Sequence, residues 1–287
     1  MRELALIAQV REALGPPPDR VVVGPGDDAA VVRTGPAQAV SIDTVVEGTH
    51  FRLDTHSHAD VGHLALATAL SDLAAMGAPA GEAYVALVLP PRIENSEALA
   101  LVASMRALAD RTGTAIAGGD VTSGPVLIVT VTVNGTLADP GDAVTRAGAN
   151  PGDLVGVTGT LGAAARRPEP RLEEGAALAR AGVSAMIDVS DGVATDALHL
   201  AEESGVLVRI ELARLPLHPG VEDPELAATG GDDYELLFTI AADRRPAAEE
   251  AAGAVGVTWL GEVAAGAGAE LLGPAGEPVE LRGFEHS

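Results

Sequence analysis

Hydrophobic residues recur at two spacings along the chain, and each spacing predicts one kind of element. Helical spacing, with stop and cap signals at the ends, predicts helices over 3–14, 58–76 and 95–112 in the first half. Short apolar or alternating runs predict strands over 21–23, 29–33, 38–46, 83–89, 114–117 and 126–137. The first half is therefore predicted to mix strands with helices.

A second group of elements follows a segment rich in Pro, Gly, Asp and Asn, from Ala138 to Gly152, which we interpret as a linker. The same criteria predict strands over 154–158, 186–189, 206–210, 234–240 and 257–263, and helices over 171–181, from 191 and over 244–252. Both halves thus belong to the α/β (α+β) class. We expect two domains, 1–138 and 139–287, with a cleft between them.

The composition narrows the kind of partner. The chain has 287 residues, of which 18 are basic and 41 acidic, and its formal net charge of −23 argues against binding nucleic acid or an anionic membrane. It contains no cysteine, which excludes disulfides and thiolate sites. No uncharged apolar stretch reaches the ~20 residues of a membrane span, and the amphipathic start is unlike a signal peptide. A cytoplasmic protein is expected.

Aspartates recur in short motifs, most of them beside glycine and at the ends of apolar runs. The motifs are Gly26-Asp27-Asp28, Ser41-Ile42-Asp43-Thr44, Ser71-Asp72, Gly118-Gly119-Asp120, Asp188-Val189-Ser190-Asp191-Gly192 and Gly230-Gly231-Asp232-Asp233-Tyr234. Isolated aspartates of this kind form turns and helix caps. So many of them suggest oxygen ligands for hard cations that hold nucleotide phosphates. Because the chain has no lysine, metal, arginine and backbone N–H groups would have to neutralise the phosphates.

The local sequence favours a ligand role for some of these residues. Asp43 lies in an apolar strand and Asp72 in an apolar helix, where a carboxylate needs a partner. Asp188 and Ser190 are predicted to leave a strand on the same side. Asp191 is predicted to cap the next helix while its remaining oxygens face a metal.

For the other candidates, the local sequence allows both a structural and a functional interpretation. A turn explains Gly26-Asp27-Asp28 as well as a ligand does. Gly118-Gly119-Asp120 follows a predicted strand, and its glycines would let a nucleotide approach the backbone. Arg146, in the linker, is either solvated or a phosphate contact, and His50 is either a surface histidine or functional. The chain lacks the P-loop, GxSxG and HExxH motifs.

In this order, the motifs resemble the thiamine-monophosphate kinases of the aminoimidazole ribonucleotide synthetase-like superfamily of ATP enzymes. The matching segments are Gly26–Ala30, Ser41–Phe51, Leu70–Gly77, Gly118–Thr122, Thr145–Ala149, Asp188–Gly192 and Gly230–Leu236. The resemblance implies a two-domain fold, in which an N-terminal mixed sheet with helices forms a homodimer interface. A C-terminal α/β domain would complete the active-site cleft, where ATP and several Mg²⁺ ions bind.

The resemblance also implies a role for individual residues. The implied metal ligands are Asp28, Ser41, Asp43, Asp72, Asp120, Asp188 and Asp191. The residues implied to bind ATP are Gly119, Asp120, Arg146 and Ser190. Thiamine monophosphate would contact His50, Asp232 and Phe284, and Asp232 stands where the family usually has Glu. Asp43, Asp120 and Arg146 would be catalytic.

The implied reaction transfers the γ-phosphoryl group of ATP in line to thiamine monophosphate, giving thiamine diphosphate. Two alternatives remain. The chain could be another ATP enzyme of the superfamily, with a different small phosphorylated substrate. However, it lacks the Cys or Lys of selenophosphate synthetases and the terminal Cys of the hydrogenase-maturation relatives. It also has Gly48-Thr49-His50 where aminoimidazole ribonucleotide synthetases have Gly-Thr-Lys. The other alternative is a non-catalytic nucleotide- or metal-binding protein.

Overall fold

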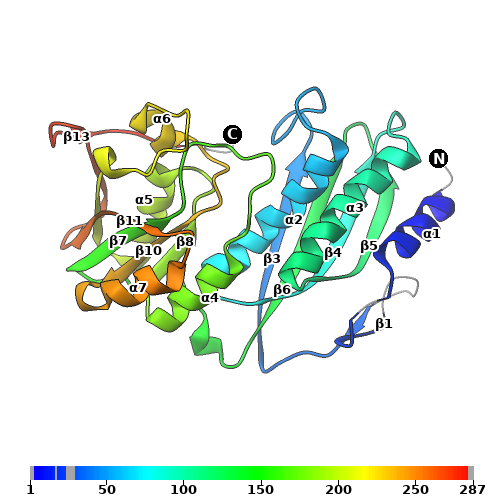
Figure 1. Cartoon of the computed structure of the whole chain (residues 1–287), viewed down its shortest axis with the longest axis horizontal. Coiled ribbons are helices and arrows are strands. Elements are labelled where there is room, and N and C mark those ends of the chain that lie inside the picture. The colour runs from blue at the N-terminus through cyan, green and yellow to red at the C-terminus, as the bar shows by residue number, and fades with distance from the viewer. Residues whose placement is uncertain (1–2, 17, 24–29, 284–287) are drawn as a thin grey trace. The chain divides into compact units, whose positions relative to one another are not determined.

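The computed structural model describes residues 3–16, 18–23 and 30–283. The chain divides into two compact units, each with its own sheet (Figure 1). The first unit comprises Met1–Leu73, Pro79–Pro140 and Arg166–Glu169, and the second comprises Ala74–Ala78, Gly141–Ala165 and Pro170–Ser287. Each unit therefore includes a short segment that interrupts the other unit along the chain.

The first unit is built on a four-stranded sheet with the strand order β3-β6-β4-β5. The strands are β3 (Ala37–Val46), β4 (Ala80–Leu89), β5 (Ala115–Ser123) and β6 (Ile128–Leu137). β6 pairs antiparallel with β3 and β4, whereas β4 pairs parallel with β5, so the sheet is mixed. The separate ribbon of this unit consists of β1 (Val21–Val23) and β2 (Val31–Val32).

Two helices, α2 (His58–Ala75) and α3 (Asn95–Thr112), cover one face of this sheet (Figure 1). They approach closely because Gly62 has no side chain, and a Cβ there would collide with the carbonyl oxygen of Leu101. On the other face β3 is exposed, with Val40 60% and Ile42 67% exposed, whereas the ribbon of β1 and β2 packs beside Ala115, Ala117 and Tyr84. None of the helices in the described ranges is long and apolar enough to cross a membrane.

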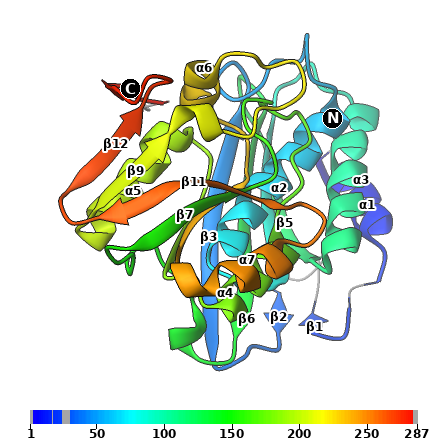
Figure 2. The same cartoon turned by 60° about the vertical axis from the view of Figure 1, so that its left-hand side comes forward.

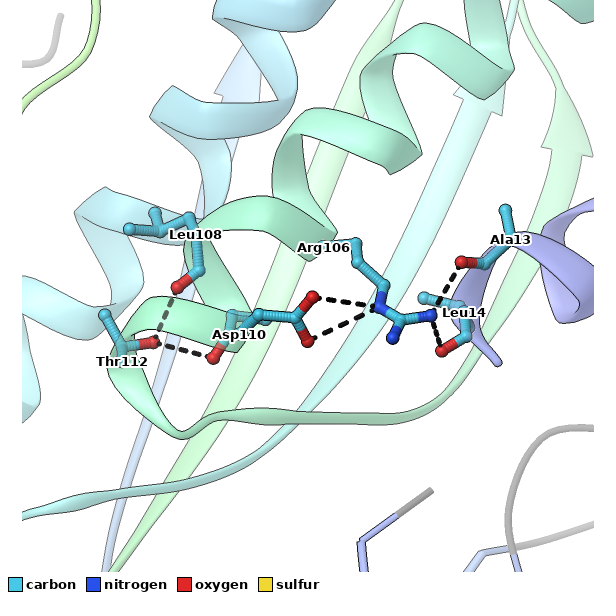
Figure 3. Close-up of polar contacts among 7 residues, drawn as sticks. Ala13, Leu14, Arg106, Leu108, Asp110 and Thr112 are labelled. Carbon is cyan, nitrogen blue, oxygen red and sulfur yellow. Dashed lines mark hydrogen bonds and ion pairs between the residues drawn. The ribbon is translucent and has the colours of Figure 1, made fainter. Parts of the chain in front are cut away.

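Helix α1 (Glu3–Leu14) is fastened to α3 through Arg106, as Figure 3 shows. The guanidinium donates to the carbonyl oxygen of Ala13 at 2.8 Å and to that of Leu14. Its Nε also donates to Asp110 on the same helix. The last carbonyls of a helix have no partner within the helix, so this arginine satisfies them and fixes where α1 ends.

The segment Arg166–Glu169 is held on α2 and α3 by polar contacts within the first unit. Arg167 Nε donates to Asp60 at 2.6 Å, and Arg111 donates to Glu169 at 2.8 Å. Burial opposes ionisation of Asp60, but hydrogen bonds from the hydroxyl and N–H of Ser57 and from Arg167 outweigh it and lower the pKa of Asp60 to about 2. Ionised Asp60 therefore stabilises the fold.

Asp60→Asn is expected to lower the free energy of unfolding by about 1–2 kcal/mol at pH 7. The native pKa lies below the unfolded value, so the contribution of Asp60 is complete above about pH 4 and is lost as the pH falls towards 2. Urea unfolding of both proteins at pH 7, 4 and 3 should show the difference shrinking with acidity. Asp243→Asn, at an exposed position, is the control. A difference that stays constant with pH would contradict this assignment.

The second unit contains a seven-stranded sheet with the order β13-β12-β9-β11-β7-β10-β8. Its strands are β7 (Asp153–Thr158), β8 (Ala185–Asp188), β9 (Leu207–Glu211), β10 (Leu236–Ala241), β11 (Val257–Ala264), β12 (Gly268–Leu272) and β13 (Pro278–Val279). The pairing is antiparallel except between β12 and β9. Its α-helices are α4 (Leu172–Ala181), α5 (Val193–Ser204), α6 (Pro224–Thr229) and α7 (Arg245–Ala252).

Helices pack on both sides of this second sheet. Val193 and Leu200 of α5 share a core with alternate residues of the strands, such as Leu237. Because side chains alternate along a strand, Phe238 points to the other side, where its ring meets that of Trp259 edge-on at 5.9 Å between centroids. On that side α4 and α7 lie beside each other (Figure 2). The predicted α/β class, with a mixed N-terminal sheet, is confirmed.

The expected end of one strand was wrong. The strand predicted to stop at Ala117 continues to Ser123, so Gly118-Gly119-Asp120 lies inside β5. Parallel pairing with β4 extends the strand, and Gly119 permits it because a Cβ there would collide with the carbonyl oxygen of Val85. Helix α6 and strands β12 and β13 were not predicted, since their short runs show no clear apolar period.

Candidate functional site

In the first unit, β3 and α2 bring three predicted ligands to one face of the sheet. The hydroxyl of Ser41 donates to the carboxylate of Asp72 on α2. Asp43 lies two residues further along β3 and therefore on the same face as Ser41. Its Oδ1 accepts the N–H of Thr44 at 3.1 Å. This group is a hydroxyl and two carboxylates, all hard oxygen donors.

Asp120 lies on the opposite face of the same sheet. The register pairs Asp120 with Ala86, Ala86 with Thr130 and Thr130 with Thr44, whereas Asp43 pairs with Val131. Partners in a ladder share a face, so Asp120 and Asp43 point in opposite directions. The side chain of Asp120 is exposed. Within the single chain, the structure does not bring Asp120 together with Asp43.

His50 follows β3 in a turn that fixes its ring. Its Nδ1 accepts the N–H of Val46 at 3.0 Å. An accepting Nδ1 carries no proton, so in the neutral ring the proton resides on Nε2. Glu47, three residues earlier, is paired with Arg92 and accepts the N–H of Leu127 at 2.9 Å. The turn thus fixes the position of the His50 ring, whose neutral form carries its proton on Nε2.

In the second unit, the predicted ligands Asp188, Ser190 and Asp191 occupy the end of β8 and the loop before α5. The prediction that Asp191 caps α5 was wrong, because the N-cap is Gly192 and no side chain caps it. Asp196, in the first turns of α5, instead accepts the N–H groups of Ser190 at 3.1 Å and of Asp191 at 3.2 Å. Asp196 was not predicted as a site residue, because it lies outside the aspartate motifs.

The environment of Asp196 disfavours its charge. It is 1% exposed. Burial and the nearby charges of Asp188 and Asp191 raise the pKa of Asp196 to about 8, although the two backbone N–H groups act in the opposite direction. Three carboxyl groups thus gather around one loop, and cations bound there would favour their ionised forms.

The segment Gly230–Tyr234 packs against the same loop. Asp232 donates its N–H to the carbonyl oxygen of Ser190 at 2.9 Å, and Tyr234 donates its N–H to that of Val189 at 2.8 Å. Both residues have left-handed backbones, with φ of 65° and 53°. The Tyr234 hydroxyl also donates to the Asp232 carboxylate at 3.0 Å. Strain of this kind persists only where the surroundings enforce it, so this carboxylate has a defined position.

Asp233 of this segment and Glu235, which directly follows it, have structural roles. Asp233 accepts the N–H of Gly162 at 2.8 Å and that of Ala163 at 3.0 Å, and burial raises its pKa to about 6. These bonds fix the backbone at Gly162 and give Asp233 a structural role. Glu235 is 4% exposed and receives Arg171 at 2.8 and 2.6 Å and the hydroxyl of Thr158 at 2.7 Å. The sequence carried no signal for this pairing.

Arg146 belongs to the predicted linker, which the structure shows to be attached to the second unit. The hydroxyl of Ser204 donates to the carbonyl oxygen of Arg146 at 2.9 Å and accepts the N–H of Gly148 at 3.1 Å. The Arg146 side chain is exposed and forms no ion pair within residues 30–283. Its backbone is therefore fixed while its guanidinium remains available for an anion.

Two predicted residues, Asp28 and Phe284, lie outside the described residues. The residue before Phe284 is well fixed, because Gly283 donates its N–H to the hydroxyl of Thr195 at 2.8 Å. A Cβ on Gly283 would collide with the carbonyl oxygen of Asp191. A cavity of about 960 Å³ lies beside it, between α5 and the C-terminal strands, with Asp191, Leu198, Leu271 and Arg282 in its lining.

The predicted metal ligands are distributed over both units. Within the described part of either unit, no three His, Cys, Asp or Glu side chains converge closely enough to hold a metal ion. The oxygen donors nevertheless fit Mg²⁺ in kind, since magnesium prefers carboxylate and hydroxyl oxygens and takes its other ligands from water and phosphate.

Comparison with known proteins assigns a family. Residues 26–137 match the family "AIR synthase related protein, N-terminal domain", and residues 150–273 match "AIR synthase related protein, C-terminal domain". The thiamine-monophosphate kinase of Escherichia coli (strain K12) is 35% identical over 322 residues, covering 99% of this chain and 98% of that protein. That of Mycobacterium tuberculosis (strain ATCC 25618 / H37Rv) is 37% identical over 243 residues, covering 77% and 73%.

Solved structures agree with this assignment. The crystal structure of thiamine-monophosphate kinase from Stenotrophomonas maltophilia K279a matches with a TM-score of 0.85 and 34% identity, over 97% of this chain and 98% of that one. AaThiL complexed with AMPPCP and TMP matches with a TM-score of 0.79 and 27% identity, over 99% and 97%. The resemblance inferred from the ordered aspartate motifs is confirmed. The chain belongs to the thiamine-monophosphate kinase family, within the AIR synthase related proteins.

Proposed function

We propose that this protein is a thiamine-phosphate kinase, which transfers the γ-phosphoryl group of ATP to thiamine monophosphate and releases thiamine diphosphate and ADP. The observation that carries the proposal is the similarity to the E. coli thiamine-monophosphate kinase over 99% of the chain. The related AaThiL, solved with AMPPCP and TMP, supports the choice of both substrates.

The acceptor makes a general base unnecessary. The second pKa of a phosphate monoester is about 6, so thiamine monophosphate is mostly dianionic at neutral pH and is itself the nucleophile. The protein must instead bring ATP and thiamine monophosphate, both polyanions, together with their reacting groups in line. Arg146 suits this task, because its exposed guanidinium forms no ion pair in the described ranges and can bind phosphate oxygens through two N–H groups. Gly119 and Ser190 would contact ATP.

The seven predicted ligands are proposed to hold several Mg²⁺ ions. They are Asp28, Ser41, Asp43, Asp72, Asp120, Asp188 and Asp191. Bound there, Mg²⁺ would neutralise phosphate charge that, in a chain without lysine, only arginine and backbone N–H groups would otherwise offset. The chain's own part is to orient these oxygens: Ser41 donates to Asp72, and Asp196 holds the backbone of Asp191.

Three residues are proposed to contact thiamine monophosphate. The Nε2–H of His50 is a suitable donor to its phosphate, because Nδ1 is already occupied by the N–H of Val46. Asp232, held by Tyr234, offers a negative charge for the cationic thiazolium ring. Phe284 follows the anchored Gly283 and would stack on a ring of the substrate.

We also propose a homodimer formed by the face of the first sheet on which Val40 and Ile42 are exposed. Ile42, 67% exposed, lies in register with Thr132 and Tyr84, which continue this face across β6 and β4. Exposed apolar side chains on a sheet face are typical of an interface. Asp120 lies on this face as well, so a partner subunit would pack near this carboxylate. A monomer in analytical ultracentrifugation at assay concentration would contradict the homodimer.

A coupled assay of ADP release, with thiamine monophosphate as the only acceptor, tests the proposed activity. We expect ADP release that depends on thiamine monophosphate and on Mg²⁺. ATP binding without ADP release would favour a non-catalytic nucleotide-binding protein. ADP release that occurs only with another small phosphorylated acceptor would identify a different enzyme of the superfamily.

A further inference from the structure

Asp196 is a buried carboxyl group that is not among the proposed metal ligands or substrate contacts. It lies in α5, is 1% exposed, and uses Oδ2 to accept the N–H groups of Ser190 and Asp191. These two residues belong to the loop that carries the proposed ligands of the second unit. Asp196 thus holds the backbone from which the side chains of Ser190 and Asp191 start.

The chemistry of this anchor is unusual for a purely structural contact. A buried carboxylate beside Asp188 and Asp191 is electrostatically unfavourable, whereas an amide or hydroxyl oxygen would accept the same N–H groups at lower cost. A carboxylate accepts both N–H groups through one oxygen and draws the two peptide planes to a single point. The direction of both planes, and hence of the side chains, is then fixed.

The second unit offers a matched comparison in Asp153. This aspartate is also buried, at 6% exposure, and also ties a loop through the N–H of Asn150 at 2.9 Å and the hydroxyl of Ser184 at 2.6 Å. The register of β10 places it at the other end of the sheet, because Ala241 pairs with Asp153 while Leu236 pairs with Asp188. Asp153 thus shares the anchoring but lies away from the proposed ligands.

We propose that Asp196 is a positioning residue: through the N–H groups of Ser190 and Asp191, it sets the directions in which these two residues present their oxygens to metal-bound ATP. This inference rests on the proposed function for the roles of Ser190 and Asp191. It predicts that Asp196 controls how tightly Mg²⁺–ATP binds more than how fast the bound complex reacts.

The test compares Asp196→Asn, Asp196→Ala and Asp153→Asn with the wild type. Calorimetric titration with ATP at fixed Mg²⁺ gives the affinity, and initial rates over a range of Mg²⁺ give KM and kcat separately. Asp196→Ala is expected to weaken Mg²⁺–ATP binding by about 10–100-fold, as for residues that orient metal ligands. Asp196→Asn keeps one acceptor oxygen but cannot carry the charge that strengthens these hydrogen bonds, so it should lie between Asp196→Ala and the wild type. The maximal rate should change less than the affinity.

Asp153→Asn is expected to lower Tm and leave the affinity for Mg²⁺–ATP unchanged. If the Asp196 variants also change only Tm, the residue is a structural anchor and the proposal is wrong. Should Asp196→Ala fail to fold, the nearly isosteric Asp196→Asn decides the outcome. Wild-type protein that binds Mg²⁺–ATP but does not phosphorylate thiamine monophosphate would overturn the proposed function alone, because the binding comparison does not use the acceptor.

Discussion

Asp43→Asn is expected to reduce turnover of ATP and thiamine monophosphate by about 100-fold or more, because the proposed charge compensation needs a carboxylate at this position. The hydrogen bond that Asp43 accepts comes from the neighbouring N–H of Thr44, and within the described residues no arginine or histidine pairs with it. The amide therefore breaks no ion pair of the fold. Turnover should fall while Tm stays within about 2 °C of the wild-type value.

A control variant at the surface shows whether turnover falls because a charge is lost at the site or because any negative charge is lost. Asp110 on α3 is 63% exposed, and Asp110→Asn should leave turnover unchanged. Asp120→Asn should behave like Asp43→Asn, since both are proposed ligands. Rates are best compared at limiting Mg²⁺, where lost affinity for the metal has its full effect. Near-normal turnover of both Asp43→Asn and Asp120→Asn under that condition would show that the metal proposal is wrong.

Arg171→Met is expected to lower the free energy of unfolding by about 3–5 kcal/mol, because it leaves the buried carboxylate of Glu235 without its guanidinium. Arg171 meets Glu235 through two hydrogen bonds, at 2.8 and 2.6 Å, and is itself only 23% exposed. Removing one partner of such a pair forces a charge to remain in a place that water does not reach. Urea unfolding at neutral pH measures the loss.

Two further variants show whether burial is the cause. Arg52 and Asp54 form an ion pair in which the side chains are 73% and 60% exposed, so Arg52→Met should change stability by less than about 1 kcal/mol. Combining Arg171→Met with Glu235→Met removes both charges and should recover much of the loss. A double variant no more stable than Arg171→Met would mean that the pair acts through packing rather than charge.

Much of the fold could be predicted from local patterns. The structure has α2 at His58–Ala75 and α3 at Asn95–Thr112, within one residue of the predicted ranges, because their apolar spacing and end signals agree. The end of β5 could not be predicted, since it depends on pairing with β4, and the strand continues through glycines that normally end one. The close pairing with β4 explains why position 119 is a glycine, independently of any role in nucleotide binding.

The candidate site likewise has a part that could be predicted and a part that could not. The order of the aspartate motifs was sufficient to indicate the family, because each motif is a short stretch of local sequence. Residues that hold these motifs in place from far away in the sequence could not be predicted. Glu235 lies 64 residues from Arg171, and nothing near either residue indicates the other. The cap predicted at Asp191 failed because a later residue, Asp196, satisfies the loop in its place.

The segment Arg166–Glu169 has a consequence for synthesis on the ribosome. Chains fold as they emerge from the N-terminus onward. The first unit nevertheless remains incomplete until residues 141–165, which belong to the second unit, have been made, because the ion pairs of Asp60 and Arg111 are formed with Arg167 and Glu169. A nascent chain ending at Pro140 therefore lacks contacts that the finished unit has. The two units are therefore expected to complete their folding together rather than one after the other.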